Sequence, residues 1–403
     1  MPSNITRREG IQLHKTRLKI GILTYHRSPN FGSAMQAYCM HNILARKLPE
    51  ATVELIDLRA STREQIQWRG YIKRVARRPW RLFSDYLPIC RNVVSRSVSL
   101  SSPVYERTSC DSIPFIQAMG YDAVVVGSDT VWEINERPGK LRAPNPFFLP
   151  GLTGIKKLAV AVSADQSQGV AIEEHPRRAE ICRAVDEFDM VAVRDQFTRE
   201  FLNRLGSRAS SEGNVRECVD PTLLADWTGE RSRSPLDSSY LGHAVLDKGV
   251  RKRVEVIAKN LGWRSLSLYD QVQRDWLSIR KRPESSVPGF LGSFRYAKMV
   301  ISDRFHGSIF GLLLRDGPVI FIERSNRYGR ELSKGRDLFR KLGIERFVLR
   351  DDHQGDWEDF FRQSYVEWFR SDADALVAAR LVQLRAEGEA FLHELRSCVL
   401  SGR

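Results

Sequence analysis

The residues best suited to chemistry in this chain lie in one short segment, the Asp-Arg-Phe-His-Gly sequence at 303–307. The apolar run at 299–302 predicts a buried strand before the segment, and the apolar residues after it predict a helix. Arg304 supplies a fixed cation, His306 a side chain of the type that exchanges protons, and Gly307 open backbone N–H groups. Open α/β sheets bind ligands where strands end and helices begin, so the segment predicts an anion site. A capped turn with one exposed histidine explains the same residues.

A second polar loop follows the first predicted strand, at 18–25. Asn30, Gly32 and Ser33 lie in this loop, at the start of a helix predicted at 33–47. Such a loop is a common anion site because its backbone N–H groups have no intrahelical partners. Asn30 and Gly32 would let a ligand approach the backbone, and Ser33 would cap the helix. The loop lacks a GxGxxG fingerprint, so we expect no nicotinamide cofactor.

A third candidate follows the apolar strand predicted at 123–126. Ser128 and Asp129 come just after its end, where a carboxylate can orient a substrate hydroxyl or accept its proton. Trp132 offers a ring on which a sugar could stack, so Ser128 and Trp132 are the candidates for contact with an acceptor. Two alternatives remain open: Ser128 or Asp129 caps a helix, and Trp132 packs in the core.

A fourth candidate is Arg194, which ends the hydrophobic strand predicted at 190–193. The paired donors of a guanidinium match the geometry of carboxylate and phosphate. An Arg194–Asp195 pair that caps the next helix is an equally open interpretation. Together with Arg304, His306 and the loop described above, Arg194 would line an anion-binding pocket between the two halves of the chain.

Strand and helix signals alternate through most of the chain, which indicates two α/β units that face each other. The predicted boundaries are an N-terminal domain at 18–228 with a basic insertion at 59–108, a C-terminal domain at 238–350, and terminal helices at 356–403. Further predicted elements lie at 53–58, 158–162, 175–187, 196–205, 239–246, 251–261, 265–268, 319–322 and 346–349.

The 403 residues carry a formal net charge of +14 and enough apolar side chains for sizeable cores. From Arg59 to Arg107, eleven Arg and Lys residues stand against three acidic ones, mixed with aromatic and aliphatic side chains. This mixture suits a bilayer face, an acidic polymer or a lipid diphosphate, although a solvated basic hairpin without a partner explains it too. No nucleic-acid-binding motif accompanies the charge, so we expect no nucleic-acid partner.

The six cysteines are scattered, without a CxxC pair or a zinc-like spacing, so we expect no metal site and a reducing compartment. Residues 1–17 are polar and basic, which argues against a secretory signal, and no apolar run is long enough to span a bilayer. We therefore expect a cytoplasmic protein. Peripheral contact with the inner face of the membrane through 59–108 is a further hypothesis.

The candidate segments together resemble the polysaccharide pyruvyl transferase family, over roughly residues 18–345. The likeness rests on stretches that occur in order: Tyr25–His26, Asn30–Ser33, Gln36–Tyr38, Val126–Asp129 with Trp132, Val193–Asp195, Asp220–Thr222 and Ser302–Gly307. The resemblance implies two facing Rossmann-like domains in a glycosyltransferase-B-like arrangement. It also implies transfer of the enolpyruvyl unit of phosphoenolpyruvate to two sugar hydroxyls, which yields a pyruvate ketal and releases phosphate.

By this resemblance, Arg304 and His306 form an Arg-x-His motif that binds the donor and supports catalysis, and Arg194 is a second donor ligand. We interpret His306 as the acid/base group, and Asp129 as a group that orients the acceptor or acts as a base. The loop at 30–33 would complete the donor site through its backbone N–H groups.

The leading hypothesis is a phosphoenolpyruvate-dependent pyruvyl transferase that acts on a sugar or lipid-linked glycan in surface polysaccharide (exopolysaccharide) or glycoconjugate biosynthesis, without a further cofactor. The alternative is a nucleotide-sugar-dependent glycosyltransferase of the same two-domain layout. Against it, the sequence places no obvious acidic residue to bind a ribose or a metal-bound diphosphate. A third hypothesis, a basic module that only tethers partners to an acidic polymer, leaves residues 304–306 unexplained.

Overall fold

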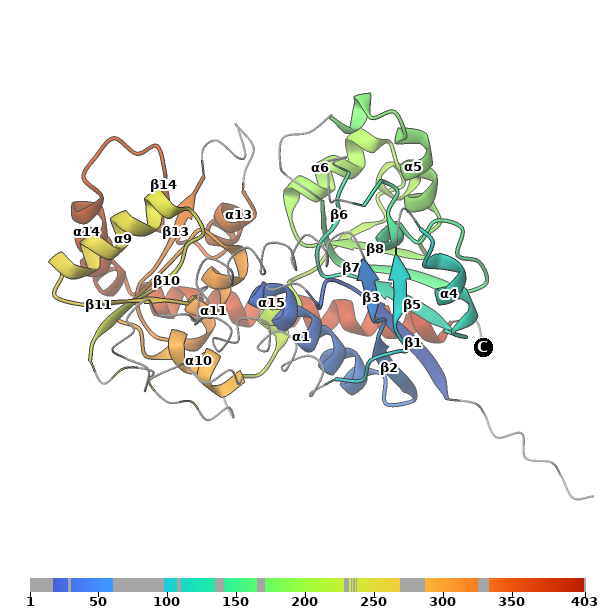
Figure 1. Cartoon of the computed structure of the whole chain (residues 1–403), viewed down its shortest axis with the longest axis horizontal. Helices are drawn as coiled ribbons and strands as arrows, with labels where there is room; N and C mark the ends of the chain where they lie inside the picture. Colours follow the sequence, from blue (N-terminus) through green and yellow to red (C-terminus); the bar gives the residue numbers. More distant parts are fainter. Residues whose placement is uncertain are drawn as a thin grey trace, which may run out of the picture.

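Two parallel β-sheets, one in each half of the chain, form the frame of the structure (Figure 1). The computed structural model describes residues 17–27, 30–60, 98–106, 110–134, 141–164, 171–227, 232, 234, 236, 238–268, 287–324 and 333–401. Most of the basic insertion predicted at 59–108 therefore lies outside the described residues. Figure 1 shows the N-terminal half, blue to green, beside the C-terminal half, yellow to orange.

The first sheet has the strand order β2-β1-β5-β7-β8-β9, and β6 pairs with β7 beyond the end of β5. Its strands are β1 (Leu18–Leu23), β2 (Ala51–Leu55), β5 (Ala123–Val126), β6 (Asp129–Trp132), β7 (Lys156–Ala164), β8 (Met190–Val193) and β9 (Val215–Glu217). A separate two-stranded sheet pairs β3 (Leu58–Ala60) with β4 (Val104–Glu106). The central strands β5, β7 and β8 are nearly continuous buried apolar runs, as expected for parallel strands covered on both faces.

The helices of the N-terminal half begin and end at residues suited to those positions. They are α1 (Phe31–Lys47), α4 (Ile113–Ala118), α5 (Arg178–Asp186), α6 (Gln196–Leu205), α7 (Arg208–Ser211) and α8 (Pro221–Leu224). The Asp195 side chain caps the start of α6, and Gly206 ends that helix with a left-handed backbone at φ 76°. Asp220 caps α8, whose first residue is Pro221.

The second sheet has the order β11-β10-β12-β13-β14, and its pairs are parallel. Its strands are β10 (Tyr240–Ala244), β11 (Arg264–Ser267), β12 (Met299–Ser302), β13 (Val319–Glu323) and β14 (Val348–Arg350). The helices of this half are α9 (Lys248–Asn260), α10 (Val287–Arg295), α11 (Phe305–Leu314), α13 (Lys334–Lys341), α14 (Trp357–Arg370) and α15 (Ala373–Leu400).

Each sheet has one point at which the strand order reverses, between β1 and β5 in the first and between β10 and β12 in the second. Ligands of such sheets bind beyond the carboxyl ends of the strands at these points. The chain that leaves β1 leads to Ser33, the chain that leaves β5 leads to Asp129, and the chain that leaves β12 leads to His306. The fold therefore directs three predicted site residues to the two reversal points.

An aromatic cluster joins the two halves. Phe31 of α1 lies 4.9 Å from Phe290 and 6.4 Å from Phe310, measured between ring centroids. Trp227 lies 5.7 Å from Phe310, and all four side chains belong to one buried apolar cluster that includes residues of both sheets. Because α1 also packs against α8 and α11, side chains at the starts of these helices are held close together.

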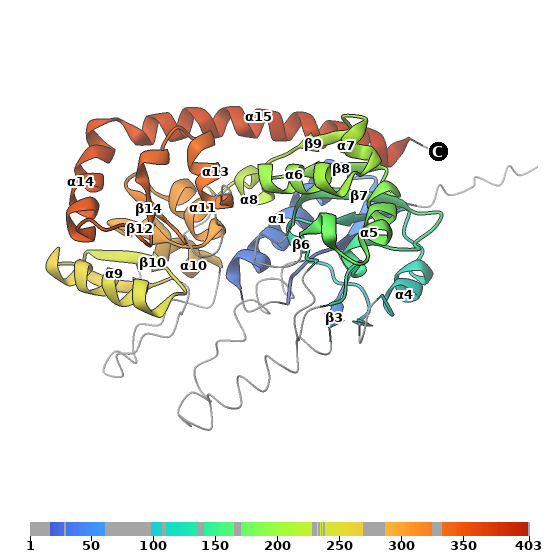
Figure 2. The same ribbon diagram turned by 90° about the horizontal axis from the view of Figure 1, so that it is seen from above.

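Helix α15 runs from the C-terminal half back along the N-terminal half, as Figure 2 shows. Arg385 donates from Nε to the Leu223 carbonyl at 2.9 Å, and Glu389 forms an ion pair with Lys47 of α1. Near the end of α15, Arg396 lies 3.0 Å from Glu50. The terminal helices therefore brace the two halves against each other.

Several predicted elements have the bounds that the sequence indicated, namely the strands at 123–126, 190–193 and 299–302 and the helix at 196–205. The prediction missed β6, because the polar residues at its start resemble a loop. It also missed α13, whose sequence is mostly charged. Within the described residues, no helix is long and apolar enough to cross a membrane.

Candidate active site

Asp220 connects the two predicted site residues that lie on opposite halves of the chain. Its Oδ2 atom lies 2.5 Å from Arg194 Nη1 and 3.3 Å from His306 Nε2. Asp220 precedes α8 in the N-terminal half, and His306 lies in the first turn of α11 in the C-terminal half. All three side chains are buried. The structure thus brings Arg194 and His306 together through a residue to which the sequence analysis gave no role.

Arg194 keeps its charge in a buried position because carboxylates surround it. The nearest are Asp220 at 2.5 Å, Asp129 at 3.7 Å and Asp195 at 4.0 Å. Burial alone would lower the pKa of Arg194, but these three carboxylates outweigh it and raise that pKa. The guanidinium also lies over the Phe305 ring, 4.8 Å from its centroid. Arg194 is therefore a fixed cation at neutral pH.

The sequence left open that an Arg194–Asp195 pair caps the next helix. Asp195 does cap that helix, but Arg194 takes no part in the cap. Its Oδ1 accepts from Thr198 N at 2.8 Å, which caps α6, and its Oδ2 accepts from Ser163 Oγ at 2.5 Å. Arg194 turns instead toward Asp220, with which its ion pair is much shorter.

Asp129 lies beside this cluster as an ionised acceptor. Its Oδ2 accepts from Ser33 Oγ at 2.6 Å, and its Oδ1 accepts from Thr130 N at 2.8 Å. Burial alone would raise the pKa of Asp129, but Arg194, His306 and these hydrogen bonds outweigh it and lower that pKa. Asp129 starts strand β6, so the helix-cap alternative for it is wrong.

The backbone of Asp129 is also unusual, because its φ is 89°. A positive φ is uncommon outside glycine, and such conformations are found more often at functional sites than elsewhere. The residue lies where β5 gives way to β6, so the local backbone directs the carboxylate toward Ser33 and Arg194.

The start of α1 differs in detail from the sequence prediction. Asn30 is the N-cap, and its Oδ1 accepts from Gly32 N at 3.1 Å. Ser33, predicted as the cap, donates instead to Asp129. A Cβ atom on Gly32 would lie 2.6 Å from Nδ1 of His306. Gly32 therefore makes room for the histidine ring, and the space above its backbone, predicted for a ligand, is filled by His306.

Ser128 and Trp132, predicted to contact an acceptor, are fully buried. The Ser128 hydroxyl donates to Gln36 Oε1 at 2.9 Å. The Trp132 ring stacks on Phe148 with centroids 5.5 Å apart, and its indole N–H donates to the Phe147 carbonyl at 3.2 Å. Neither side chain is available to a sugar, so the acceptor prediction is wrong and Trp132 is a core residue.

Lys334, at the start of α13, is a further cation that the sequence analysis missed. Its Nζ donates to Thr130 Oγ1 at 2.8 Å and lies 3.3 Å from the Ala164 carbonyl oxygen. It thus reaches from the C-terminal half to the residue that follows Asp129. Arg304 is the last residue before α11, where its side chain is half-buried.

A cavity of about 330 Å³ lies next to the cluster. Its lining includes Arg194, Asp220, Phe305 and Lys334, with further residues of α13 and α15. Among the described residues, Arg194 Nε is one of the few buried side-chain donors without a hydrogen-bond partner. It lies 4.0 Å from Asp195 Oδ2, close to that carboxylate but beyond hydrogen-bond distance.

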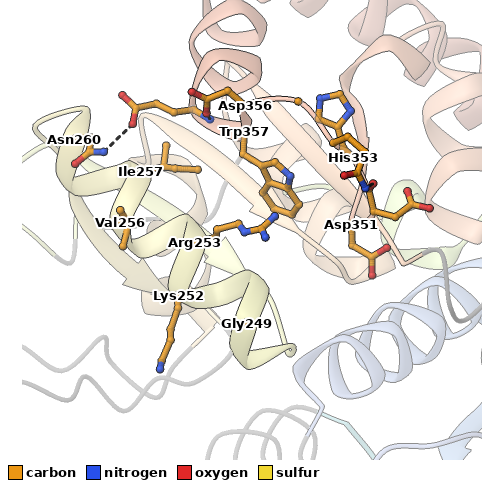
Figure 3. A pocket seen from close by; sticks show the side chains of 14 residues that line it. Gly249, Lys252, Arg253, Val256, Ile257, Asn260, Asp351, His353, Asp356 and Trp357 are labelled. Carbon is orange, nitrogen blue, oxygen red and sulfur yellow. Dashed lines mark hydrogen bonds between the residues drawn. The ribbon is translucent and has the colours of Figure 1, made fainter.

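A larger hollow of about 680 Å³ lies on the C-terminal half, between α9 and the start of α14 (Figure 3). Arg253 lies over the Trp357 ring at 4.8 Å, and Asn260 donates to Glu358 at 2.7 Å. None of the predicted site residues lines this hollow. Arg194 lines the smaller cavity and contacts Asp220, which in turn contacts His306, so we place the chemistry beside that cavity.

The described residues hold no group of three or more His, Cys, Asp or Glu side chains placed to bind a metal ion. Two signals could have identified Asp220. It stands before Pro221, which marks a helix start, and it belongs to the Asp220–Thr222 stretch that supports the family resemblance. Lys334 had no such signal, because it is one of many charged residues in a polar stretch.

The fold is similar to those of glycosyltransferases among solved structures. The UGT73P12 protein of Glycyrrhiza uralensis, complexed with glycyrrhetinic acid 3-O-monoglucuronide, matches with 9% identity and a TM-score of 0.50, over 96% of this chain and 97% of that one. An α,α-trehalose-phosphate synthase (UDP-forming) from Burkholderia vietnamiensis matches with 10% identity and a TM-score of 0.49, over 94% and 100%. At such identities the likeness shows the fold alone. The predicted glycosyltransferase-B-like arrangement is confirmed.

No curated protein matches this chain. The family model described as polysaccharide pyruvyl transferase matches residues 30–326, which is more than half of the sequence. The matched stretch begins at the cap of α1 and includes Arg194, Asp220 and His306. The chain therefore belongs to the polysaccharide pyruvyl transferase family.

Proposed function

We propose that the protein transfers the enolpyruvyl group of phosphoenolpyruvate to two hydroxyls of a sugar, with formation of a pyruvate ketal. The observation that carries the proposal is the contact of Arg194 and His306 with one carboxylate, Asp220, beside a cavity of about 330 Å³. It combines a fixed cation for an anionic donor with a side chain able to move a proton. Membership of the family supports the same reaction.

The cavity offers cations to the donor, alongside an equal number of acidic side chains: Arg194, Lys334, Lys341 and Arg380, and Glu217, Asp220, Asp337 and Glu387. Phosphoenolpyruvate carries a carboxylate and a phosphate, and Arg194 is among the residues that line the cavity. Lys334 lines the same cavity, and the first turn of α11 adds the positive end of a helix. We infer that Arg194, Lys334 and Arg304 bind the donor. The Asn30 and Ser33 side chains are already engaged, so the loop at 30–33 would contribute backbone N–H groups.

The proposed reaction balances without a further reactant. One sugar hydroxyl adds to C2 of phosphoenolpyruvate, and the methylene carbon takes up a proton and becomes a methyl group. The second hydroxyl then attacks C2, the bond from C2 to the phosphate oxygen breaks, and the ketal ring closes. The two hydroxyl groups lose two protons in total. One proton is taken up in the new methyl group, and the other leaves with the phosphate.

His306 and Asp129 would divide the work of this reaction. His306 is the proposed acid/base group, because it contacts Asp220, the carboxylate that lines the cavity and also holds the donor ligand Arg194. A general base works best when its pKa is near the operating pH. Since the pKa of Asp129 is lowered, we assign Asp129 to orienting a sugar hydroxyl rather than to removing its proton.

We infer that the acceptor is the sugar of a surface polysaccharide or of a lipid-linked glycan, because the family model names polysaccharide as the substrate class. The excess of positive charge from Arg59 to Arg107 supports a proposed contact with anionic lipid at the cytoplasmic face of a membrane.

Calorimetric titration of phosphoenolpyruvate tests the proposal. We expect saturable binding to the wild type, at least 10-fold weaker binding to Arg304→Ala, and nearly unchanged binding to His306→Gln, which should release no phosphate in the presence of an acceptor glycan. Arg199→Ala is the matched control, because Arg199 is an exposed arginine of α6 that pairs with Glu217 at 3.6 Å. It should bind the donor like the wild type.

The outcome that contradicts the proposal is saturable binding of a nucleotide sugar together with no binding of phosphoenolpyruvate, with or without acceptor. That result would favour the alternative, a nucleotide-sugar-dependent glycosyltransferase.

A further inference from the structure

Both oxygens of Asp220 are fully engaged by groups that donate hydrogen bonds. Oδ1 accepts from Thr222 N at 3.0 Å and from Thr222 Oγ1 at 2.5 Å. Oδ2 accepts from Arg194 Nη1 at 2.5 Å and lies 3.3 Å from His306 Nε2. The side chain is 99% buried, so solvent does not compete for these positions.

The state of Asp220 follows from these contacts. Burial alone would raise the pKa of Asp220, but His306, Arg194 and the Thr222 hydroxyl outweigh it and hold that pKa well below its usual range. The group is therefore a carboxylate, which only accepts hydrogen bonds. A ring nitrogen in hydrogen-bond contact with a carboxylate must carry a proton, so Nε2 of His306 is the protonated nitrogen whether the ring is neutral or charged.

We propose that Asp220 is the positioning residue of the site, which holds the proton on Nε2 of His306 and leaves Nδ1 as the atom that exchanges a proton with the substrate. The arrangement parallels the role of a buried carboxylate that fixes the tautomer of a catalytic histidine in other enzymes. The role of Nδ1 in catalysis rests on the proposed function. The tautomer of His306 rests only on its contact with Asp220 and is independent of that function.

The position of Nδ1 fits this assignment. Nδ1 is the ring atom nearest to the place of a Cβ on Gly32, so it faces the first turn of α1. The next residue, Ser33, donates to Asp129, the group assigned to orient a sugar hydroxyl. Nδ1, which has no hydrogen bond among the described interactions, therefore lies beside the start of α1, next to the residue that contacts Asp129. In the proposed reaction, the proton that the methylene carbon receives would come from Nδ1.

The contact between Asp220 and His306 also depends on how the two halves of the chain pack together. The carboxylate is fixed within the N-terminal half by Thr222 and Arg194, whereas His306 arrives from α11, 86 positions later in the chain. Only when α8 and α11 are packed together does the ring receive its partner. The tautomer of His306 thus reports whether the site is assembled.

The test is the ¹⁵N NMR spectrum of the full-length protein with labelled histidine, recorded at pH 8, where the ring nitrogen with a proton and the one without are well separated. The signals of His306 are identified by their loss in His306→Gln. We expect a proton on Nε2 and none on Nδ1 in the wild type. A proton on Nδ1 alone in the wild type would overturn the proposal, and this result requires no variant of Asp220.

The variant Asp220→Asn extends the test. Its amide N–H group would face two donors of Thr222 in place of Oδ1 but only one, Arg194 Nη1, in place of Oδ2. We therefore expect the amide N–H group at the Oδ2 position, where it loses the Arg194 contact and donates to Nε2. We expect the proton of His306 to move to Nδ1 in this variant. Asp195→Asn is the matched control, because Asp195 is a buried carboxylate beside Arg194 without a contact to His306 among the described interactions. It should keep the proton on Nε2.

Kinetics complete the test. We expect Asp220→Asn to lower kcat for phosphate release from phosphoenolpyruvate by about 100-fold, with folding intact by circular dichroism. Unchanged kcat in a variant whose tautomer has moved would overturn the catalytic part of the proposal. If the wild type releases no phosphate from phosphoenolpyruvate with any acceptor, the proposed function fails, whereas the NMR result still decides the role of Asp220.

Discussion

Gly32 lies against the imidazole ring of His306, so that a Cβ on Gly32 would be 2.6 Å from Nδ1 and 2.8 Å from Cγ. Real Cβ atoms are not found this close to other heavy atoms, so any side chain at position 32 must displace the ring. The ring is held on its other side by Asp220, 3.3 Å from Nε2. Gly32 therefore helps to set the distance between His306 and its carboxylate partner.

Gly32→Ala should reduce activity without unfolding the protein. Displacement of a reacting group by about 1 Å can cost about 100-fold in rate, so we expect kcat for pyruvyl transfer to fall by about that factor. Gly32 is the second residue of α1 and does not have a positive φ, so alanine suits its backbone. Phosphate release and thermal unfolding, measured on the same preparation, check this expectation.

Gly249→Ala is the matched control, because Gly249 is the second residue of α9 as Gly32 is of α1. A Cβ on Gly249 would meet only the Asp247 carboxylate, at 3.2 Å. Activity of this variant should stay within twofold of the wild type. Equal activity of Gly32→Ala and Gly249→Ala would show that the Gly32 contact does not control His306.

Removal of the Arg194 charge should destabilise the protein strongly. Arg194→Met would leave Asp220, Asp129 and Asp195 buried without their shared cation. Breaking a buried ion pair by removing one partner costs about 3–5 kcal/mol, so we expect a loss of that order in the free energy of unfolding. Urea unfolding followed by circular dichroism at pH 7.5 measures it.

Arg199→Met serves as the control for charge removal, because Arg199 pairs with Glu217 in an exposed position. Exposed ion pairs contribute about 0–1 kcal/mol, so this variant should unfold almost like the wild type. Similar losses in the two variants would mean that the carboxylates around Arg194 find other partners or are protonated.

Much of the frame could be predicted from the sequence because it depends on neighbouring residues. The strand at 190–193 is a short run of apolar residues, and Asp195 and Gly206 mark the start and end of the following helix. The place of Arg194 and of His306 at strand ends followed from the same local patterns. These signals lie within a few residues of the feature that they predict.

The contacts that assemble the site depend on residues far apart in the chain, which no local pattern reveals. Asp220 meets His306 across 86 positions, and Lys334 meets Thr130 across 204. The burial of Trp132 likewise depends on Phe148 and on the surrounding core. A tryptophan in a polar stretch resembles a sugar-stacking residue until the layers around it are known.

His243 should make stability depend on pH. It is buried in β10, and burial, with a smaller contribution from Arg251, lowers the pKa of His243 to about 4. The unfolded chain takes up a proton near pH 6.5, whereas the folded chain does not until about pH 4. Stability from the neutral ring is therefore fully present above pH 6.5 and is lost as pH falls from 6.5 to 4, by about 3 kcal/mol.

Urea unfolding of the wild type and of His243→Phe at pH 8, 6.5, 5.5 and 4.5 measures this contribution. Phenylalanine has a ring of similar size and no titrating group. The difference between the two proteins should be constant from pH 8 to about 7 and should then move in favour of the variant as the pH falls. A parallel pH dependence of the two proteins would contradict the assignment to His243.

The close approach of α15 to α8 provides a test of how the two halves are braced. A Cβ on Gly388 would lie 2.5 Å from Leu224 Cδ2 and 2.8 Å from Val219 Cγ2. Gly388→Val should therefore push α15 away from the segment that contains Asp220. Overpacking of this kind costs about 1–3 kcal/mol, which denaturant unfolding would show. We expect activity to fall as well, because the Asp220 contact with His306 depends on the position of α8.

Ala386→Val is the matched control, because Ala386 is exposed on the same helix two residues earlier. It makes the helix slightly less favourable, by about 0.5 kcal/mol, but does not crowd α8. Helix propensity alone predicts opposite signs, because valine is a worse helix former than alanine but a better one than glycine, so equal losses in the two variants would contradict a specific effect of crowding α8. A loss of activity confined to Gly388→Val, together with a changed ¹⁵N signal of His306, would show that the contact between α15 and α8 sets the geometry of the site.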